Sequence, residues 1–303
     1  MSPAAFDLPP EGAARSAPAL GPHEFARFQA LIYREAGIHL AECKQALLVG
    51  RLSRRLRALG LRSFGAYWRL VADGGDPAER RRMLEAVCTH ETRFFREPQH
   101  WEFLATGLFP RWRAEAATRG RARRVRAWSA GCSSGEEPYS LAMALLEHFP
   151  AAEGWSLEVV ATDLSTGVLE RARTGIWPIA KKDEIPEPYL RRYMLRGRRS
   201  QEGTLAAGPA LRRLVRFQPL NLNDAEYDLA GRFDLVFCRN VLIYFDTASR
   251  AAAVDRLLDR LEPGGHLFLG HAESLSRVTG RAKHVLPTVY TRSDGPAAPA
   301  AAR

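Results

Sequence analysis

The sequence lacks any hydrophobic run long enough to cross a membrane. No stretch of its 303 residues approaches the roughly 18 apolar residues that a membrane span needs. The first residues, rich in proline and alanine, lack the basic and then apolar pattern of a secretory signal peptide. We therefore expect a cytoplasmic protein with no direct membrane insertion.

Cysteine and histidine are too scattered to indicate a disulfide framework or a metal centre. The four cysteines, Cys43, Cys88, Cys132 and Cys238, form no CxxC pair, which argues against disulfides and a zinc ribbon. We interpret them as small buried residues. The eight histidines show no HxxxH spacing, so no metal is expected.

The charge balance is strongly basic. The formal net charge is +10, which favours an acidic partner, although a GC-rich genome would also enrich an alanine-rich chain in arginine. The hydrophobic content of 46% and charged content of 26% are ordinary for a globular protein. The length allows two domains.

Hydrophobic spacing changes along the chain, and this change predicts the domain organisation. We expect a disordered lead at residues 1–20, an all-helical domain at 21–88, a larger domain at 89–292 and a flexible tail at 293–303. In the larger domain, strand-like runs alternate with helical segments, which is typical of an α/β fold with a parallel sheet. The expected strands are residues 125–129, 157–162, 214–220, 233–238 and 266–269. A basic insertion at 174–211 is too long for an ordinary loop and is predicted to form a small subdomain.

The helical domain carries a basic flank. Leu48, Leu52, Leu56 and Leu59 form one apolar stripe, and beside it stand the candidate docking residues Arg51, Arg54 and Arg55. No acid occurs between residues 43 and 62. Such an uncompensated face is either a solvated surface or a docking surface for an acidic helix or nucleic acid.

The run from residue 125 to 139 predicts a strand, a tight turn and the start of a helix. Gly131 and Gly135 allow positive φ and the close approach of a ligand, and Ser133 and Ser134 could cap the helix. The turn is neither a dinucleotide fingerprint nor a P-loop.

Acidic residues stand where a bound phosphate would normally sit. Glu136 and Glu137 open the helix and would repel a phosphate. Asp163 ends the next strand, where Rossmann-like sheets hold ribose hydroxyls. Together these acids indicate a nucleoside with a cationic group, although the glycines could be simple turn formers and the glutamates could simply complement the helix dipole.

Five motifs in sequence order carry a resemblance to a known family. The chain resembles the CheR family of chemotaxis receptor methyltransferases over about residues 25–292. The motifs are Thr89-His-Glu-Thr-Arg-Phe-Phe-Arg96, Gly131-Cys-Ser-Ser-Gly-Glu-Glu-Pro-Tyr-Ser140, Ala161-Thr-Asp163, Phe233-Asp-Leu-Val-Phe-Cys-Arg-Asn-Val-Leu-Ile-Tyr-Phe-Asp246 and Leu261-Glu-Pro-Gly-Gly265.

The resemblance implies a Rossmann-like class I methyltransferase domain with a small inserted subdomain, preceded by a small all-α domain. It implies S-adenosylmethionine as methyl donor, S-adenosylhomocysteine as product, and glutamate side chains on the cytoplasmic helical domain of a methyl-accepting chemotaxis receptor as acceptors. A monomer is expected. In some relatives the insertion adds a receptor pentapeptide to a sheet edge; the residues here leave that open.

The resemblance also assigns site residues. The cofactor contacts fall on His90, Thr92, Arg96, Glu136, Asp163, Asn221, Leu222, Arg239 and Asn240. His90 departs from the asparagine that many relatives have there. We expect Arg96 and Tyr244 to form the catalytic pair that positions the substrate, although a tyrosine after an apolar run is often a core residue.

The expected chemistry needs no general base, because a glutamate is ionised at neutral pH with an ordinary pKa of about 4.3. Two rival functions are weaker. A nucleic-acid methyltransferase would carry an Asn/Asp-Pro-Pro-aromatic turn where this chain has Cys238-Arg-Asn-Val, so no nucleic-acid partner is expected. A non-catalytic module is disfavoured by the intact Arg96, Glu136 and Asp163.

Overall fold

The computed structural model describes residues 19–118, 120–276 and 278–293, and these residues form two compact units. The first unit contains the described residues up to 31 and residues 40–87, and the second contains residues 32–39 and 88–293. The predicted lead at 1–20 and tail at 293–303 lie almost wholly outside the described residues.

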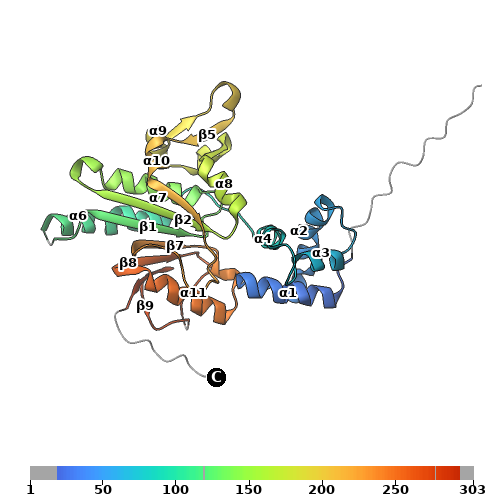
Figure 1. Cartoon of the computed structure of the whole chain (residues 1–303). Coiled ribbons are helices and arrows are strands. Elements are labelled where there is room, and N and C mark those ends of the chain that lie inside the picture. The colour runs from blue at the N-terminus through green and yellow to red at the C-terminus, as the bar shows by residue number, and fades with distance from the viewer. Residues whose placement is uncertain (1–18, 119, 277, 294–303) are drawn as a thin grey trace, which may run out of the picture. The chain divides into compact units, whose positions relative to one another are not determined.

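The first unit is built from helices. It contains most of α1 (Pro22–Ala36), then α2 (Gln45–Ala58), α3 (Phe64–Val71) and α4 (Pro77–Val87) (Figure 1). Leu48, Leu52 and Leu56 of the predicted stripe are buried, whereas Leu59 lies just past the end of α2 and is exposed. Phe28 of α1 stacks on Tyr67 of α3. The apolar stripe thus forms part of the core of this unit.

The second unit is organised around a seven-stranded sheet with the order β6-β2-β1-β7-β8-β10-β9 (Figure 1). Pairing is parallel from β6 to β8, and β10 then runs antiparallel to β8 and to β9. The bounds are β1 (Arg124–Ala130), β2 (Ser156–Asp163), β6 (Val215–Pro219), β7 (Phe233–Cys238), β8 (Leu261–Leu269), β9 (Ala282–Leu286) and β10 (Val289–Arg292).

The central strands are buried on both faces because helices connect them. Every residue of β7 is buried, as expected for a strand covered on both sides. The connecting helices are α7 (Glu136–His148), α8 (Thr166–Thr174) and α11 (Thr247–Asp259), and α5 (Pro98–Glu102), a π-helical stretch and α6 (Phe109–Thr118) precede β1. All five predicted strands exist, so the expected α/β fold is confirmed. The β9–β10 hairpin was not foreseen.

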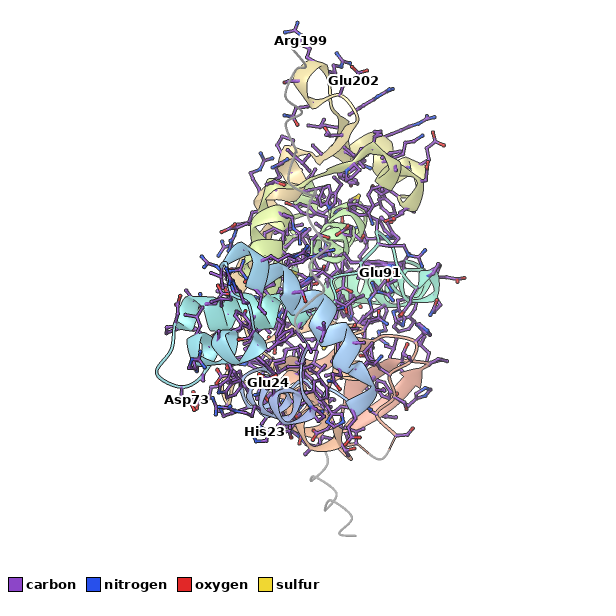
Figure 2. All side chains as sticks on the ribbon, turned by 90° about the vertical axis from the view of Figure 1, so that its right-hand side faces the viewer. His23, Glu24, Asp73, Glu91, Arg199 and Glu202 are labelled. Carbon is purple, nitrogen blue, oxygen red and sulfur yellow. The ribbon has the colours of Figure 1, made fainter. Side chains whose placement is uncertain are left out.

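The insertion forms a second, smaller sheet. Its strands are β3 (Ile176–Pro178), β4 (Met194–Arg196) and β5 (Thr204–Ala207), in the antiparallel order β3-β5-β4. Short helical segments join them: η4 (Ile179–Glu184), α9 (Glu187–Tyr193) and η5 (Arg199–Gln201). Helix α10 (Pro209–Leu214) then leads from β5 to β6 of the large sheet. Arg199 and Glu202 lie at the far tip of this insertion (Figure 2).

Two expectations about composition have structural outcomes. Cys132 and Cys238 are buried, but Cys43 is exposed and Cys88 is half-buried, so the expectation that all four cysteines are buried is wrong. Among the described residues, no helix combines the length and the apolar character required to span a bilayer.

Candidate functional site

Several candidate residues follow the carboxyl ends of neighbouring parallel strands. Gly131 follows β1, Asp163 ends β2, Asn221 lies just past β6 and Arg239 directly follows β7. The strand order reverses between β1 and β7. Ligands of open α/β sheets bind in the crevice outside the carboxyl ends at such a reversal.

The turn after β1 has the predicted backbone, and its glycines also permit close packing. Gly131 and Gly135 have φ values of +81° and +99°, as expected. A Cβ on Gly131 would lie 2.5 Å from a methyl of Val241, and one on Gly135 would lie 3.0 Å from the Cβ of Ala172. These glycines therefore allow close packing by the protein itself, and the close approach of a ligand stays a prediction.

The two serines of the turn do not cap helix α7. Its N-cap residue is Gly135, with no side-chain cap. The Ser133 hydroxyl donates to the His90 carbonyl oxygen at 3.0 Å, and the Ser134 hydroxyl donates to Glu136 at 2.7 Å. The predicted capping role is wrong, and Ser133 instead attaches the 89–96 segment to the turn.

Asp163 anchors the turn. It is buried, and its oxygens accept from the backbone N–H of Ser133 and of Ser165, each at 2.9 Å. The Asp163 carbonyl oxygen also accepts from Leu220 N–H at 3.1 Å, which places Asn221 beside the end of β2.

The Asn221 side chain is used within the protein. Its amide donates to the Glu35 carbonyl oxygen at 2.6 Å, and its Oδ1 accepts from Asn223 N–H at 3.0 Å. Leu222 is buried, and its carbonyl oxygen accepts from the Tyr227 hydroxyl. Contacts of Asn221 with a ligand are therefore expected to come from its backbone.

The first acid of α7 faces a lysine from the insertion. Glu136 has 2% of its surface exposed, and its Oε1 lies 3.4 Å from Nζ of Lys181. A nearly buried carboxylate is stabilised by a neighbouring cation or hydrogen-bond donor. Lys181 is such a cation for Glu136, and contact of Glu136 with a cationic ligand group stays a prediction.

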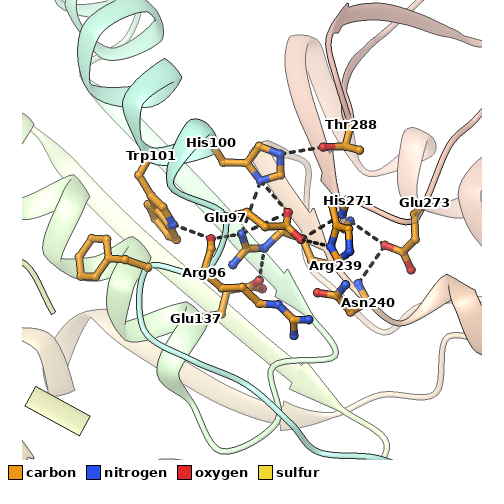
Figure 3. A network of polar contacts seen from close by, with 12 residues as sticks. Arg96, Glu97, His100, Trp101, Glu137, Arg239, Asn240, His271, Glu273 and Thr288 are labelled. Carbon is orange, nitrogen blue, oxygen red and sulfur yellow. Dashed lines mark hydrogen bonds and ion pairs between the residues drawn. The ribbon is translucent and has the colours of Figure 1, made fainter. Parts of the chain in front are cut away.

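The second acid, Glu137, forms a buried ion pair with Arg239. Its Oε2 accepts from Arg239 Nε at 2.7 Å and its Oε1 accepts from the Ser129 hydroxyl at 2.6 Å. Arg239 also donates to the carbonyl oxygen of Arg96 (Figure 3). The Arg239 guanidinium, predicted as a cofactor contact, is thus the centre of a network that fixes the main chain at Arg96.

Helix α5 and the β10 end of the sheet complete this network. Glu97 accepts from His271 N–H at 3.0 Å, and His100 contacts the Thr288 hydroxyl at 2.8 Å (Figure 3). Burial, followed by the positive charge of Arg239, lowers the pKa of His100 to about 4. The His100 ring is therefore uncharged near pH 7. Its Nδ1 lies 3.4 Å from Oε2 of Glu97, and this contact is not an ion pair.

Arg96 keeps its guanidinium available. Its carbonyl oxygen accepts from Trp101 Nε1 at 2.9 Å, whereas its guanidinium makes only a 3.4 Å bond to the Glu91 carbonyl oxygen. Within the described part of the chain, no acidic side chain pairs with it. A half-buried guanidinium in this state suits a carboxylate of a ligand or substrate.

The segment after β7 carries a buried acceptor that lacks a partner. Asn240 has φ +60°, and its Oδ1 is buried without a hydrogen-bond partner in the described structure. An orphaned buried acceptor normally has a water or ligand donor. Tyr244 follows in a short 3-10 helix and is half-buried, with its carbonyl oxygen accepting from His39 N–H.

Glu273 was not predicted, although it holds this segment. Its buried carboxylate accepts from the backbone N–H of Asn240 at 2.9 Å, Ile243 at 3.2 Å and Gly270 at 2.7 Å. Burial raises the pKa of Glu273, and the backbone hydrogen bonds oppose that rise. An acid four residues after β8, at the same sheet edge as the other acids, was the available signal.

Residues in the left-handed backbone region concentrate at this edge. Among the described residues, six non-glycine residues have positive φ, and four of them are Phe95, Glu97, Ser133 and Asn240. Such conformations cost about 1–3 kcal/mol each and cluster at functional sites.

The predicted docking flank lies in the first unit and is partly neutralised. Arg55 forms two hydrogen bonds with Glu79 of α4, the one from Nε at 2.9 Å. Arg51 donates to the Val87 carbonyl oxygen, and Arg54 is exposed. The expectation of an uncompensated basic face is therefore wrong for Arg55, because the compensating acid comes from another helix.

The donor set fits S-adenosylmethionine. Asp163 is a buried carboxylate at the end of β2, Glu136 and the orphaned Asn240 Oδ1 suit an ammonium group, and Arg96 suits a carboxylate. Among the described residues, no group of three or more histidine, cysteine or acidic residues is arranged to hold a metal.

The fold and this set of residues define a class I S-adenosylmethionine-dependent methyltransferase. When the strands of the large sheet are numbered in sequence order, their spatial order is 3-2-1-4-5-7-6, and strand 7 (β10) runs antiparallel to strand 5 (β8). Two family models match: the CheR methyltransferase, SAM binding domain, over residues 90–291, and the CheR methyltransferase, all-alpha domain, over residues 23–88. The chain belongs to the CheR methyltransferase family.

Curated relatives agree over most of the chain. Chemotaxis protein methyltransferase 2 of Pseudomonas aeruginosa is 38% identical, with 88% of this chain and 92% of the relative covered. Chemotaxis protein methyltransferase of Escherichia coli is 39% identical, with 91% and 92% covered. A solved glycopeptide N-methyltransferase complexed with S-adenosylmethionine is 20% identical, with 53% of this chain and 48% of that chain covered and a TM-score of 0.30, a likeness too weak to add to the assignment.

Proposed function

We propose that this protein transfers the methyl group of S-adenosylmethionine to glutamate side chains of methyl-accepting chemotaxis receptors, giving glutamate methyl esters. The observation that carries the proposal is the family match across both units. The relatives' names support chemotaxis as the setting. The acceptor would be the receptor's cytoplasmic helical domain, and the enzyme would act in the cytoplasm as a monomer.

The residues of the site would divide the binding of the cofactor. Asp163 would accept hydrogen bonds from the ribose hydroxyls, and Glu136 and Asn240 would face the ammonium group. His90, Thr92, Asn221 and Leu222 would line the site. Asn221 would do so mainly through its main chain, because its side-chain amide donates to the Glu35 carbonyl oxygen and its Oδ1 accepts from Asn223 N–H. Arg239 would act by fixing Arg96.

Catalysis would consist of alignment and the exclusion of water. The bound cofactor supplies an electrophilic methyl group on a sulfonium. The acceptor glutamate is already ionised near neutral pH, since its ordinary pKa is about 4.3, so the protein needs no general base. Arg96 and Tyr244 would orient the acceptor carboxylate. Alignment of this kind can lower a reaction barrier by roughly 7–11 kcal/mol.

Receptor docking would use the cations that have no internal acidic partner. Of the three predicted docking residues, Arg54 is exposed, whereas Arg55 is paired with Glu79. In the insertion, Arg191 pairs with Glu187 and Arg192 pairs with Glu147, whereas Arg196, Arg198 and Arg199 are exposed. An acidic receptor surface would be attracted mainly through the association rate, with strong salt dependence. Unchanged receptor methylation by Arg54→Glu at low salt would refute this role for Arg54.

The first test is a calorimetric titration with S-adenosylmethionine and S-adenosylhomocysteine. We expect the wild type to bind both and Asp163→Ala to lose binding, because the acceptor of the hydroxyls and the anchor of the Ser133 turn disappear together. Asp183→Ala is the control, since Asp183 is an exposed acid of the same unit. Binding of neither ligand by the wild type would refute the proposal.

A further inference from the structure

Lys181 and Glu184 of the insertion contact the 89–96 segment. Lys181 and Glu184 stand three residues apart in η4, and Lys181 Nζ lies 3.0 Å from Oε1 of Glu184. Lys181 Nζ donates to the Thr92 carbonyl oxygen at 3.0 Å, and Glu184 Oε2 accepts from Phe94 N–H at 2.9 Å. The pair therefore holds two main-chain groups of this segment, the carbonyl of Thr92 and the N–H of Phe94.

The same lysine also reaches the first acid of α7. Its Nζ lies 3.4 Å from Oε1 of Glu136, the acid proposed to face the ammonium group of the cofactor. One side chain of the insertion thus contacts two parts of the proposed cofactor site, the 89–96 segment and the start of α7.

An aromatic contact joins the insertion to the same two segments. Trp177 of β3 packs edge-on against Phe94, with ring centroids 5.0 Å apart, and its Nε1 donates to the Ser134 carbonyl oxygen at 3.2 Å. The small sheet is therefore attached to the same two segments by packing as well as by charge.

The neighbouring residues in η4 provide a natural comparison. Lys182 and Asp183 have the same charges, but their side chains are 52% and 77% exposed and lie 3.6 Å apart, whereas those of Lys181 and Glu184 are each 24% exposed. No hydrogen bond from either Lys182 or Asp183 reaches the 89–96 segment in the described structure. Burial and direction, rather than charge alone, distinguish the two pairs.

We propose that Lys181 and Glu184 are positioning residues for cofactor binding, through which the insertion holds Thr92, Phe94 and Glu136 in the geometry that binds S-adenosylmethionine. This rests on the cofactor site set out under the proposed function. Hydrogen bonds that involve a charged group contribute about 1.5–3 kcal/mol, so loss of Lys181 weakens S-adenosylmethionine binding by about tenfold or more.

The experiment compares Lys181→Met with Lys182→Met, and Glu184→Gln with Asp183→Asn, by calorimetric titration with S-adenosylmethionine. We expect a dissociation constant about tenfold higher for Lys181→Met, a smaller rise for Glu184→Gln, which can still accept from Phe94 N–H, and no change for the two controls. Lys181→Arg restores most of the affinity, because its guanidinium can reach the same acceptors.

A second measurement needs no cofactor. Amide hydrogen exchange of the free protein reports whether Phe94 N–H is protected, and we expect lower protection in Lys181→Met than in Lys182→Met, with similar melting temperatures. Equal affinity and equal protection in these two variants would overturn the inference. So would an affinity loss that Lys181→Arg does not restore and that follows a general loss of stability. The titration uses no receptor, so its outcome is independent of which substrate is methylated.

Discussion

Replacing Glu137 by glutamine tests the buried network at the centre of the site. The change keeps the shape of the side chain but removes the charge that pairs with Arg239, whose Nε lies 2.7 Å from Glu137 Oε2. The side chains are 9% and 2% exposed, so solvent cannot compensate for the lost partner.

Removing one member of a buried ion pair costs about 3–5 kcal/mol. We expect the lower end, about 3 kcal/mol, because glutamine can still accept from Arg239 and Glu97 lies 3.8 Å from the same guanidinium. For a unit of this size the melting temperature would then fall by roughly 6–12 °C. The double variant Glu137→Leu with Arg239→Met should be less destabilised, because neither member of the Glu137–Arg239 pair is left buried without its partner.

Urea unfolding followed by circular dichroism measures the effect, and Glu147→Gln is the matched control. Glu147 lies on the same helix and pairs with Arg192 at 3.0 Å, but both side chains are partly exposed. Its loss should cost no more than about 1 kcal/mol. If Glu137→Gln lies within that range as well, the network does not stabilise the site in the way described.

Other residues of the site give further expectations. The pKa of Glu273 is raised by burial, so its contribution to stability should fall as pH rises from the ordinary value of 4.5 through the raised value; Glu273→Gln should remove that part of the pH dependence in thermal unfolding, and an unchanged profile would contradict it. Because the pKa of His100 is lowered from 6.5 to about 4, its contribution to stability should be lost as pH falls through that interval, and His100→Gln should flatten the loss. Arg96→Lys should raise the KM for the receptor substrate about tenfold or more, because a bidentate contact with the acceptor carboxylate is lost. An unchanged KM for the receptor would argue against binding of that carboxylate by Arg96. Tyr244→Phe should lower kcat without changing S-adenosylmethionine affinity, and a weakened affinity would move Tyr244 to the cofactor.

The parallel strands of the large sheet could be predicted from the sequence because each is a compact apolar run. β7 is buried along its whole length, and its residues 233–238 were predicted at their observed bounds. The β9–β10 hairpin was missed because its strands are only partly apolar: in β9, Lys283, His284 and Val285 are all exposed.

The site could be predicted only as a set of positions. A strand end located Asp163 and the family resemblance located Arg239, but whether a side chain faces a ligand or the protein depends on tertiary partners. Arg239 turned out to be fixed by Glu137, and the Cβ position of Gly131 is blocked by Val241. Neither contact is local in sequence, so no spacing rule could indicate it.

The pairs that join the insertion to the rest of the unit were missed for the same reason. Lys181 and Glu184 read as ordinary charges of a polar segment, and only the folded chain places them against Thr92 and Phe94. The compensation of Arg55 by Glu79 likewise joins residues of different helices.

The most direct test of the central claim is transfer of a radiolabelled methyl group from S-adenosylmethionine to the cytoplasmic domain of a receptor from the same organism. Carboxyl methyl esters hydrolyse in mild base, so the account predicts label on the receptor that base releases as methanol. The label should also be absent from a receptor whose acceptor glutamates are replaced by glutamine. Base-stable label, or no label from an enzyme that binds S-adenosylmethionine, would contradict glutamate methylation as the function.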